Sequence, residues 1–138
     1  MSSKSSTVSS ELAGARVLVM GLGAHGGGAA SARYCAEAGA EVTVTDLRDE
    51  SALGESVASL DDLPIRYVLG RHELDDFRRA DIVVKNPAVP RSAPLLREAE
   101  RIETDISLFL AQHRGPVLAV TGTKGKSTTA SALHHVLA

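Results

Sequence analysis

The segment Thr121–Thr128, with the sequence TGTKGKST, is the part of this chain best suited to chemistry on phosphates. Its glycines let backbone N–H groups approach phosphate oxygens, its lysines neutralise charge, and a hydroxyl after the second lysine can bind Mg²⁺. The general P-loop needs a glycine where Val120 stands, so only the shorter pattern Gly-Thr-x-Gly-Lys-Ser is met. We predict an ATP phosphate site with Lys126 as its catalytic cation and Ser127 as the Mg²⁺ ligand. Its residues are Gly122, Thr123, Lys124, Gly125, Lys126, Ser127 and Thr128.

A second glycine-rich loop, Gly21-Leu-Gly-Ala-His-Gly26, follows an apolar run and precedes an alanine-rich segment. This G-x-G-x-x-G pattern between a strand and a helix is typical of a nucleotide or nucleotide-sugar diphosphate site, although a tight turn without a ligand is the alternative. The run Gly26–Gly28 indicates very close packing where the helix begins. Asp46 lies where an acidic residue could meet a ribose hydroxyl, and Arg48 could contact a diphosphate or a base.

Apolar runs alternate with helical patterns along most of the chain. We predict strands at 16–20, 41–45, 65–69, 81–85 and 116–120, and helices at 29–38, 51–60, 74–79, 93–101, 105–113 and 127–138. This alternation predicts an α/β fold, with a Rossmann-like parallel sheet flanked by helices. We assign residues 1–13 to a disordered lead-in and 14–110 to the Rossmann-like domain. Residues 111–138 would then be a linker and the first strand, P-loop and helix of an ATPase domain.

Composition limits the possible partners. Of the 138 residues, 43% are hydrophobic and 3% aromatic, so the core must be aliphatic, and the net charge of −2 makes nucleic acid a poor partner. No apolar run reaches the length of about 20 residues that spans a membrane, so we expect no membrane insertion and a cytoplasmic location. The single cysteine, Cys35, is expected to be a small buried helix residue.

Four segments together resemble the Mur ligases, the ATP-dependent enzymes that add amino acids to the peptidoglycan precursor. They are Gly21–Gly26, Asp46–Arg48, Asn86–Pro90, and Asp105–Phe109 followed by the P-loop. The likeness covers residues from about 14 to 138 and is greatest to the branch that adds D-glutamate.

This resemblance implies substrates and site residues. The substrates would be UDP-N-acetylmuramoyl-L-alanine and D-glutamate, joined through an acyl phosphate at the expense of ATP, with Mg²⁺. Lys126 and Ser127 match the residues that bind the ATP phosphates and Mg²⁺. The UDP-sugar would be bound by Gly23, Ala24, His25, Gly26, Asp46, Leu47, Arg48, Asn86 and Pro87.

The sequence also departs from the family pattern. Lys124 stands where asparagine is usual, and Ala88 stands where glycine is common, so Ala88 is expected to adopt a glycine-like conformation less readily. We expect an N-terminal fragment, inactive as a ligase, in which residues 116–138 take a non-native position and can self-associate through an apolar strand edge. Two other functions stay open: a nicotinamide-dependent oxidoreductase domain, which leaves the P-loop unexplained, and a non-catalytic nucleotide-sugar-binding protein.

Overall fold

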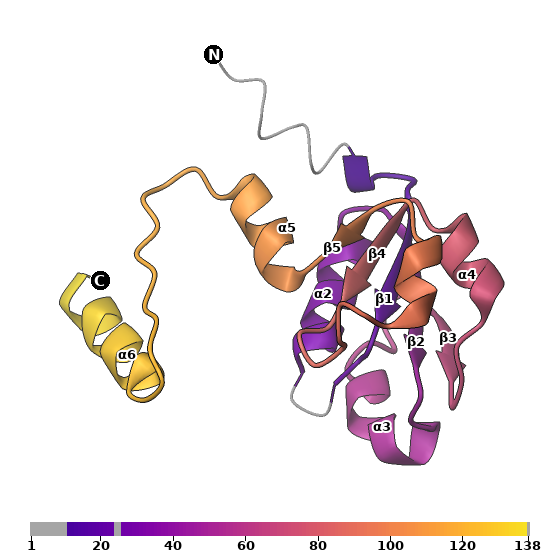
Figure 1. Ribbon diagram of the computed structural model, residues 1–138, viewed down its shortest axis with the longest axis horizontal. Coiled ribbons are helices and arrows are strands. Elements are labelled where there is room, and N and C mark those ends of the chain that lie inside the picture. The colour runs from indigo at the N-terminus through magenta and orange to yellow at the C-terminus, as the bar shows by residue number, and fades with distance from the viewer. Residues whose placement is uncertain (1–10, 24–25, 138) are drawn as a thin grey trace.

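A parallel sheet forms the centre of the computed structural model, which describes residues 11–23 and 26–137 (Figure 1). The sheet has five strands in the order β3-β2-β1-β4-β5. They are β1 (Arg16–Met20), β2 (Glu41–Asp46), β3 (Arg66–Leu69), β4 (Ile82–Lys85) and β5 (Ile102–Glu103). The predicted α/β fold with a Rossmann-like sheet is therefore confirmed.

Helices cover both faces of this sheet. On one face, side chains of α2 (Gly27–Glu37), α3 (Glu50–Ala58) and α5 (Asp105–Gln112) pack against Val17, Val19 and Val44. On the other face, α4 (Leu74–Arg79) and the 3₁₀ helix η1 (Pro94–Glu98) bury Phe77 and Leu96 against Leu18, Met20 and Val83. The strands are almost continuously apolar because both of their faces are buried.

The strand order creates a place for a ligand beside β1. The chain moves from β1 to β2 and β3 on one side, and then returns to β4 and β5 on the other. The loops after β1 and β4 consequently diverge, and a crevice forms at the carboxyl ends of these strands. The Gly21–Gly26 loop follows β1 and Asn86 follows β4, so both reach this crevice.

The predicted strand at 116–120 is wrong: these residues are irregular and mostly exposed. An apolar run becomes a strand only where a neighbouring strand can pair with its backbone, and residues 116–120 have no such neighbour among the described residues. The short edge strand β5 was not predicted. The helix expected at 93–101 is limited to the 3₁₀ turn η1, which begins at a proline.

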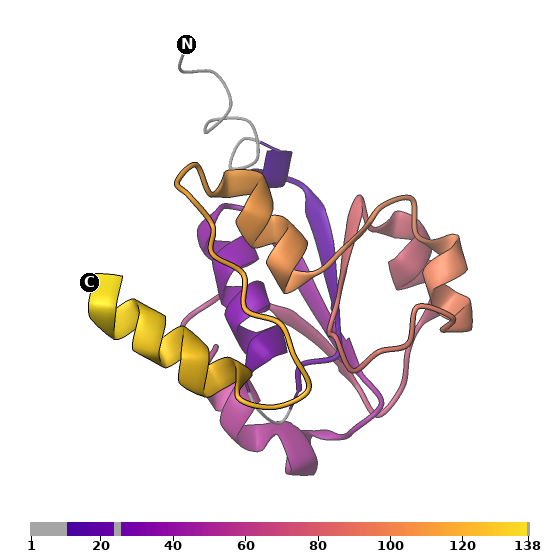
Figure 2. The same ribbon diagram turned by 60° about the vertical axis from the view of Figure 1, so that its left-hand side comes forward.

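The two ends of the described chain differ in their packing. Leu12, in the segment 1–13 assigned to a disordered lead-in, is completely buried in the same core cluster as Cys35, which is buried in α2 as expected. By contrast, α6 (Lys126–Leu137) has no buried residue and stands away from the sheet in Figure 1, and Figure 2 shows its C-terminal end pointing outward from the rest of the chain. Within residues 11–23 and 26–137, no helix has the length and apolarity needed to cross a bilayer.

Candidate functional site

A cleft of about 620 Å³ lies at the carboxyl ends of the strands. Loops after β1, β2, β3 and β4 all contribute to it. The residues that line it are Gly21, Gly23, Gly27, Asp46, Leu47, Arg48, His72, Asn86, Pro87, Ala88, Val89 and Asp105. The structure therefore brings the three sequence-predicted substrate segments to one cleft, although they are separated by up to about sixty residues of chain.

The first glycine loop has a backbone that only glycine adopts readily. Gly21, Gly23 and Gly26 have φ angles of 90°, 76° and 83°. Gly28 is required for a different reason, which is close packing. A Cβ added at Gly28 would lie 2.2 Å from the carbonyl oxygen of Gly21. The close approach predicted for the Gly26–Gly28 run is confirmed, and it falls at the last of the three glycines.

The N-terminus of α2 opens onto this cleft through Gly27. Its N-cap is Gly26, which provides no side-chain hydrogen bond to the N–H groups of the first turn. Eleven residues of helix align their dipoles behind this end, which favours an anion. Ala24 and His25, which were also predicted to bind the diphosphate, lie outside the described residues.

Asp46 connects two of the cleft loops. One carboxylate oxygen accepts hydrogen bonds from Leu22 N (2.9 Å) and Arg48 Nη2 (2.9 Å), and the other accepts from Arg48 N and Nε. Burial raises the pKa of Asp46, but the hydrogen bonds from Arg48 and Leu22 outweigh it and hold the pKa below its usual value. Asp46 is therefore an anion that positions the glycine loop, and its predicted contact with a ribose stays a prediction.

Arg48 and Leu47 form the outer wall of the cleft. The side chain of Arg48 is 40% exposed although it pairs with Asp46, and Leu47 is 69% exposed. An apolar side chain beside a guanidinium at the mouth of a cleft can contact a planar ring, while the guanidinium is free to reach a phosphate on one side.

The loop after β4 is held in a tight turn by its own asparagine. The side-chain oxygen of Asn86 accepts a hydrogen bond from Ala88 N (3.0 Å), and the backbone carbonyl of Asn86 accepts one from Val89 N. No described non-glycine residue has a positive φ. Ala88 therefore fits this turn without a left-handed backbone, although glycine is common at this position in the family.

Sequence reasoning missed a residue that lines the cleft, His72, and a residue that supports one of its loops, Lys85. Lys85 is only 6% exposed, and its ammonium donates hydrogen bonds to the carbonyls of Asn86 (3.2 Å) and Val89 (2.8 Å), beneath the cleft loop. His72 lies in the loop after β3 and lines the cleft. The available signal was position: both residues stand at or just after the carboxyl end of a parallel strand, where ligand sites form.

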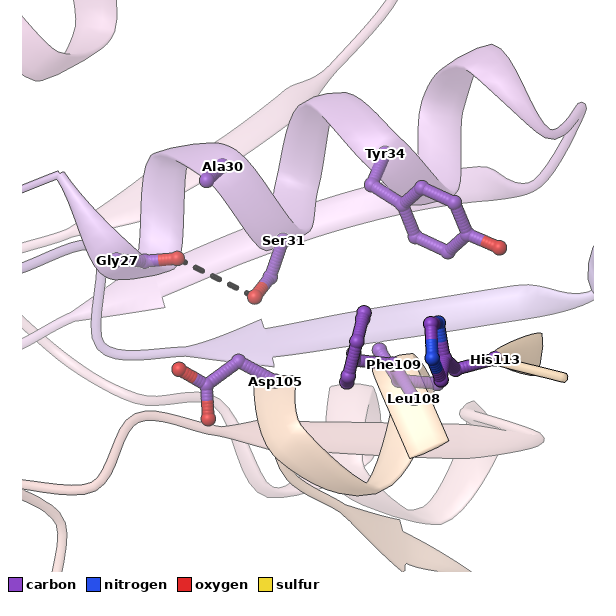
Figure 3. Close-up of a pocket in the computed structure, with 8 residues that line it drawn as sticks. All are labelled: Gly27, Ala30, Ser31, Tyr34, Asp105, Leu108, Phe109 and His113. Carbon is purple, nitrogen blue, oxygen red and sulfur yellow. Dashed lines mark hydrogen bonds between the residues drawn. The ribbon is translucent and has the colours of Figure 1, made fainter. Parts of the chain in front are cut away.

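A second, largely apolar hollow of about 470 Å³ lies between α2 and α5 (Figure 3). Tyr34 from α2 and Phe109 from α5 line it, and the Phe109 ring stacks on His113. The hollow shares Gly27 and Asp105 with the nucleotide-sized cleft, so the two are adjacent.

Residues 15–107 match the family described as "Mur ligase MurD-like, N-terminal domain". The chain belongs to this MurD-like Mur ligase family. The match ends inside α5, so it comprises the whole sheet and every described cleft residue.

Individual relatives agree with this family. The chain is 51% identical over 129 residues to a UDP-N-acetylmuramoylalanine–D-glutamate ligase of Borreliella afzelii, covering 92% of this chain and 29% of the relative. It is 53% identical over 132 residues to the ligase of the same name from Treponema pallidum, covering 91% and 25%. The chain thus spans less than a third of the length of these relatives.

A solved structure has a similar backbone. A pseudomurein peptide ligase type C from Methanothermus fervidus superposes with a TM-score of 0.58 at 26% sequence identity, covering 89% of this chain and 26% of that protein. The chain and this ligase therefore have a similar fold.

The predicted ATP phosphate site lies apart from the cleft of this family domain. Gly122 and Gly125 have positive φ angles, and α6 begins at Lys126. The ammonium of Lys126 donates to Gly122 O (2.6 Å) within the same loop. All of its predicted residues, from Gly122 to Thr128, are exposed, and the last three of them form the first turn of α6.

Proposed function

We propose that the cleft binds the UDP portion of UDP-N-acetylmuramoyl-L-alanine. The observation that carries this proposal is the convergence on one cleft of the glycine loop, the Asp46–Arg48 pair and the Asn86 turn, in a domain of the MurD-like family. The α2 N-terminus and Arg48 supply the positive potential that a diphosphate needs. Leu47 and the Asn86–Val89 turn line the cleft and would contact the base.

We further propose that the longer protein joins this nucleotide to D-glutamate. A carboxylate is a poor electrophile, so ATP would first transfer its γ-phosphoryl group to the L-alanyl carboxylate, releasing ADP. The amine of D-glutamate would then attack the acyl carbon, forming an amide and releasing phosphate and a proton. The names of the relatives at about 50% identity support this reaction.

The role of the P-loop in this reaction rests on the fit of its residues. Its N–H groups and the Lys126 ammonium suit ATP phosphates, and the hydroxyl of Ser127 suits Mg²⁺, which would neutralise charge on the phosphate oxygens. The described residues hold no group of three His, Cys, Asp or Glu side chains placed to bind a metal. Ser127 would therefore be this chain's contribution to a shared Mg²⁺ site.

An NMR titration of the 138-residue chain with UDP tests the nucleotide assignment. We expect chemical-shift changes at residues 21–23, 26–27, 46–48 and 86–89, and larger ones with UDP-N-acetylmuramoyl-L-alanine. NADH is the comparison ligand, because a nicotinamide-dependent oxidoreductase would bind it in the same crevice. Shifts with NADH but none with UDP would overturn the proposal.

A pair of arginine variants tests the site itself. Arg48→Gln should weaken UDP binding by about tenfold, because a charge-assisted hydrogen bond to the diphosphate is lost. Arg97→Gln is the control, since Arg97 is exposed on η1 and does not line the cleft. Equal affinities for UDP in the two variants would contradict the assignment of Arg48.

A further inference from the structure

His72 occupies a defined place in the cleft. The carbonyl of Arg48 accepts a hydrogen bond from Gly70 N (2.9 Å), and Asp46 forms an antiparallel bridge with Arg71, so the loop before His72 is fixed beside the Asp46–Arg48 pair. The imidazole packs edge-on against the Phe77 ring, with centroids 5.9 Å apart. The ring is therefore held by both its backbone and its neighbours.

The hydrogen bonds around Thr45 determine which nitrogen of His72 carries the proton. The hydroxyl of Thr45 lies 3.1 Å from the carbonyl oxygen of Arg71 and 2.7 Å from His72 Nδ1. The carbonyl can only accept, and Thr45 has a single proton to donate. Both contacts are therefore hydrogen bonds at the same time only when Thr45 donates to the carbonyl and Nδ1 donates to the Thr45 oxygen, and this arrangement, which satisfies the most groups, makes the neutral ring the Nδ1–H tautomer.

The other ring nitrogen, Nε2, is then an acceptor. It has no hydrogen-bond partner within the described part of the chain, and it is not among the buried unpartnered atoms there. Because His72 lines the cleft, this nitrogen is the acceptor that the loop after β3 offers to a ligand.

An acceptor at this position distinguishes nucleobases. The Watson–Crick edge of uracil presents an N3–H donor, whereas cytosine presents a bare N3 acceptor at the same place. A bare N3 facing Nε2 would leave two lone pairs opposed and both groups without a hydrogen bond.

We propose that His72 is a specificity-determining residue of the cleft, fixed by Thr45 and the Arg71 carbonyl so that Nε2 accepts a hydrogen bond from the imide N–H of a uracil-type base. This inference rests on the proposed binding of UDP and adds the residue that selects the base. It also gives a role to Thr45, which is completely buried in β2.

Calorimetric titration with UDP and CDP tests the inference in the 138-residue chain. The wild-type chain should bind UDP about tenfold more tightly than CDP, the value of one hydrogen bond gained or lost. His72→Asn keeps a donor near the Nδ1 position and removes Nε2. It should weaken UDP binding by about tenfold and leave CDP binding unchanged. His72→Gln restores an acceptor at the outer position and should recover part of the preference.

Different outcomes of this titration distinguish a failure of the proposed role of His72 from a failure of the proposed UDP binding. An unchanged UDP-to-CDP ratio in His72→Asn would overturn the role of His72 and leave UDP binding intact. Equal weakening of both ligands would assign His72 a structural role only, which also overturns it. Failure of the wild-type chain to bind either nucleotide would overturn the proposed function itself and the inference with it.

The tautomer has a readout that does not depend on binding. Long-range ¹H–¹⁵N spectra of the free chain should show His72 as the Nδ1–H tautomer, and UDP should shift Nε2 more than Nδ1. An Nε2–H tautomer in the free chain would overturn the inference even if the affinities agreed with it.

Discussion

Lys85 is a buried cation whose partners are carbonyl oxygens rather than a carboxylate. Its two hydrogen bonds reach forward to Asn86 and Val89, so the ammonium fastens the turn that forms one wall of the cleft. A side chain that the substrate does not touch can in this way fix the shape of the binding site.

Replacing Lys85 with methionine should loosen this turn. Lys85→Met keeps the length of the side chain but removes both hydrogen bonds, so we expect a loss of about 1 kcal/mol in unfolding free energy. UDP affinity measured by calorimetry should fall as well, because the Asn86 wall is no longer fixed. Arg97→Met, at an exposed residue of η1 that does not line the cleft, is the control and should leave both quantities unchanged. Unaltered UDP affinity in Lys85→Met would contradict the positioning role.

Gly28 allows the start of α2 to pack closely against the loop that follows β1. Its Cα hydrogen faces the carbonyl oxygens of Gly21 and Leu22, and a Cβ would approach them to 2.2 and 2.5 Å. The helix can therefore begin close to the phosphate-sized loop only while this position has no side chain.

Gly28→Ala should consequently destabilise the domain by about 3 kcal/mol or more, because backbone atoms cannot move aside as a side chain can. The matched control is Gly54→Ala in α3, where a Cβ meets nothing within 4 Å. That variant should gain about 0.5–1 kcal/mol, since alanine favours a helix over glycine. Urea unfolding of the two variants measures both effects. Similar stabilities would show that α2 does not approach β1 as closely as described.

At the scale of the elements, an ion pair joins the starts of β1 and β4. Asp81, just before β4, accepts hydrogen bonds from Arg16 N (2.8 Å) and Arg16 Nη2 (2.7 Å). These hydrogen bonds from Arg16 lower the pKa of Asp81 to about 2. The pair is exposed, so its contribution to stability is small and falls with added salt.

The sign of the pH effect follows from that lowered pKa. The pair contributes fully above the ordinary aspartate pKa of about 4, and its contribution is lost as the pH falls through about 2. Asp81→Asn should therefore be less stable than the wild-type chain at pH 6, and the difference should shrink steadily between pH 4 and pH 2. Thermal unfolding across this range measures it, with Asp75→Asn, an exposed carboxylate without an ion pair among the described residues, as the control. A difference that grows on acidification would contradict the assignment.

At the scale of the whole molecule, the chain has a packed part and an unpacked part. The core clusters take their residues from 12 to 108, whereas residues 113–119 and 121–137 are exposed and include the apolar Val117, Leu118 and Val136. The packed core of the described residues therefore takes no side chain from the P-loop segment. We propose that this exposed apolar segment is where copies of the chain self-associate.

Removing residues 114–138 should therefore leave the domain intact. We expect a melting temperature within about 2 °C of the full chain, because no core side chain is lost. UDP affinity should be unchanged, and light scattering should show less self-association. Brief trypsin digestion offers the same test, with cleavage first at the exposed Arg114, Lys124 and Lys126. A large fall in melting temperature would show that the C-terminal segment packs on the sheet.

The sequence by itself determined the local features of this protein. Apolar runs with β-branched residues gave four strands within a residue or so of their observed bounds, and the glycine pattern after β1 gave the loop at the cleft. These signals are local, because strand propensity and backbone conformation depend on a residue and its near neighbours. The family motifs located Asp46, Arg48 and Asn86 for the same reason: each stands at a fixed offset from a strand end.

Only the tertiary structure decided which groups meet. Residues 116–120 have the pattern of a strand, yet strand pairing needs a neighbour that the pattern does not specify. Asp46 bonds to Leu22, 24 residues away, and Thr45 bonds to His72, 27 residues away, so neither contact has a local signal. The P-loop is the sharper of the two glycine-rich signals in the sequence, yet among the described residues it is the glycine loop that other loops surround, whereas the P-loop is exposed. A binding site needs several chain segments in one place, and that convergence is a property of the folded sheet.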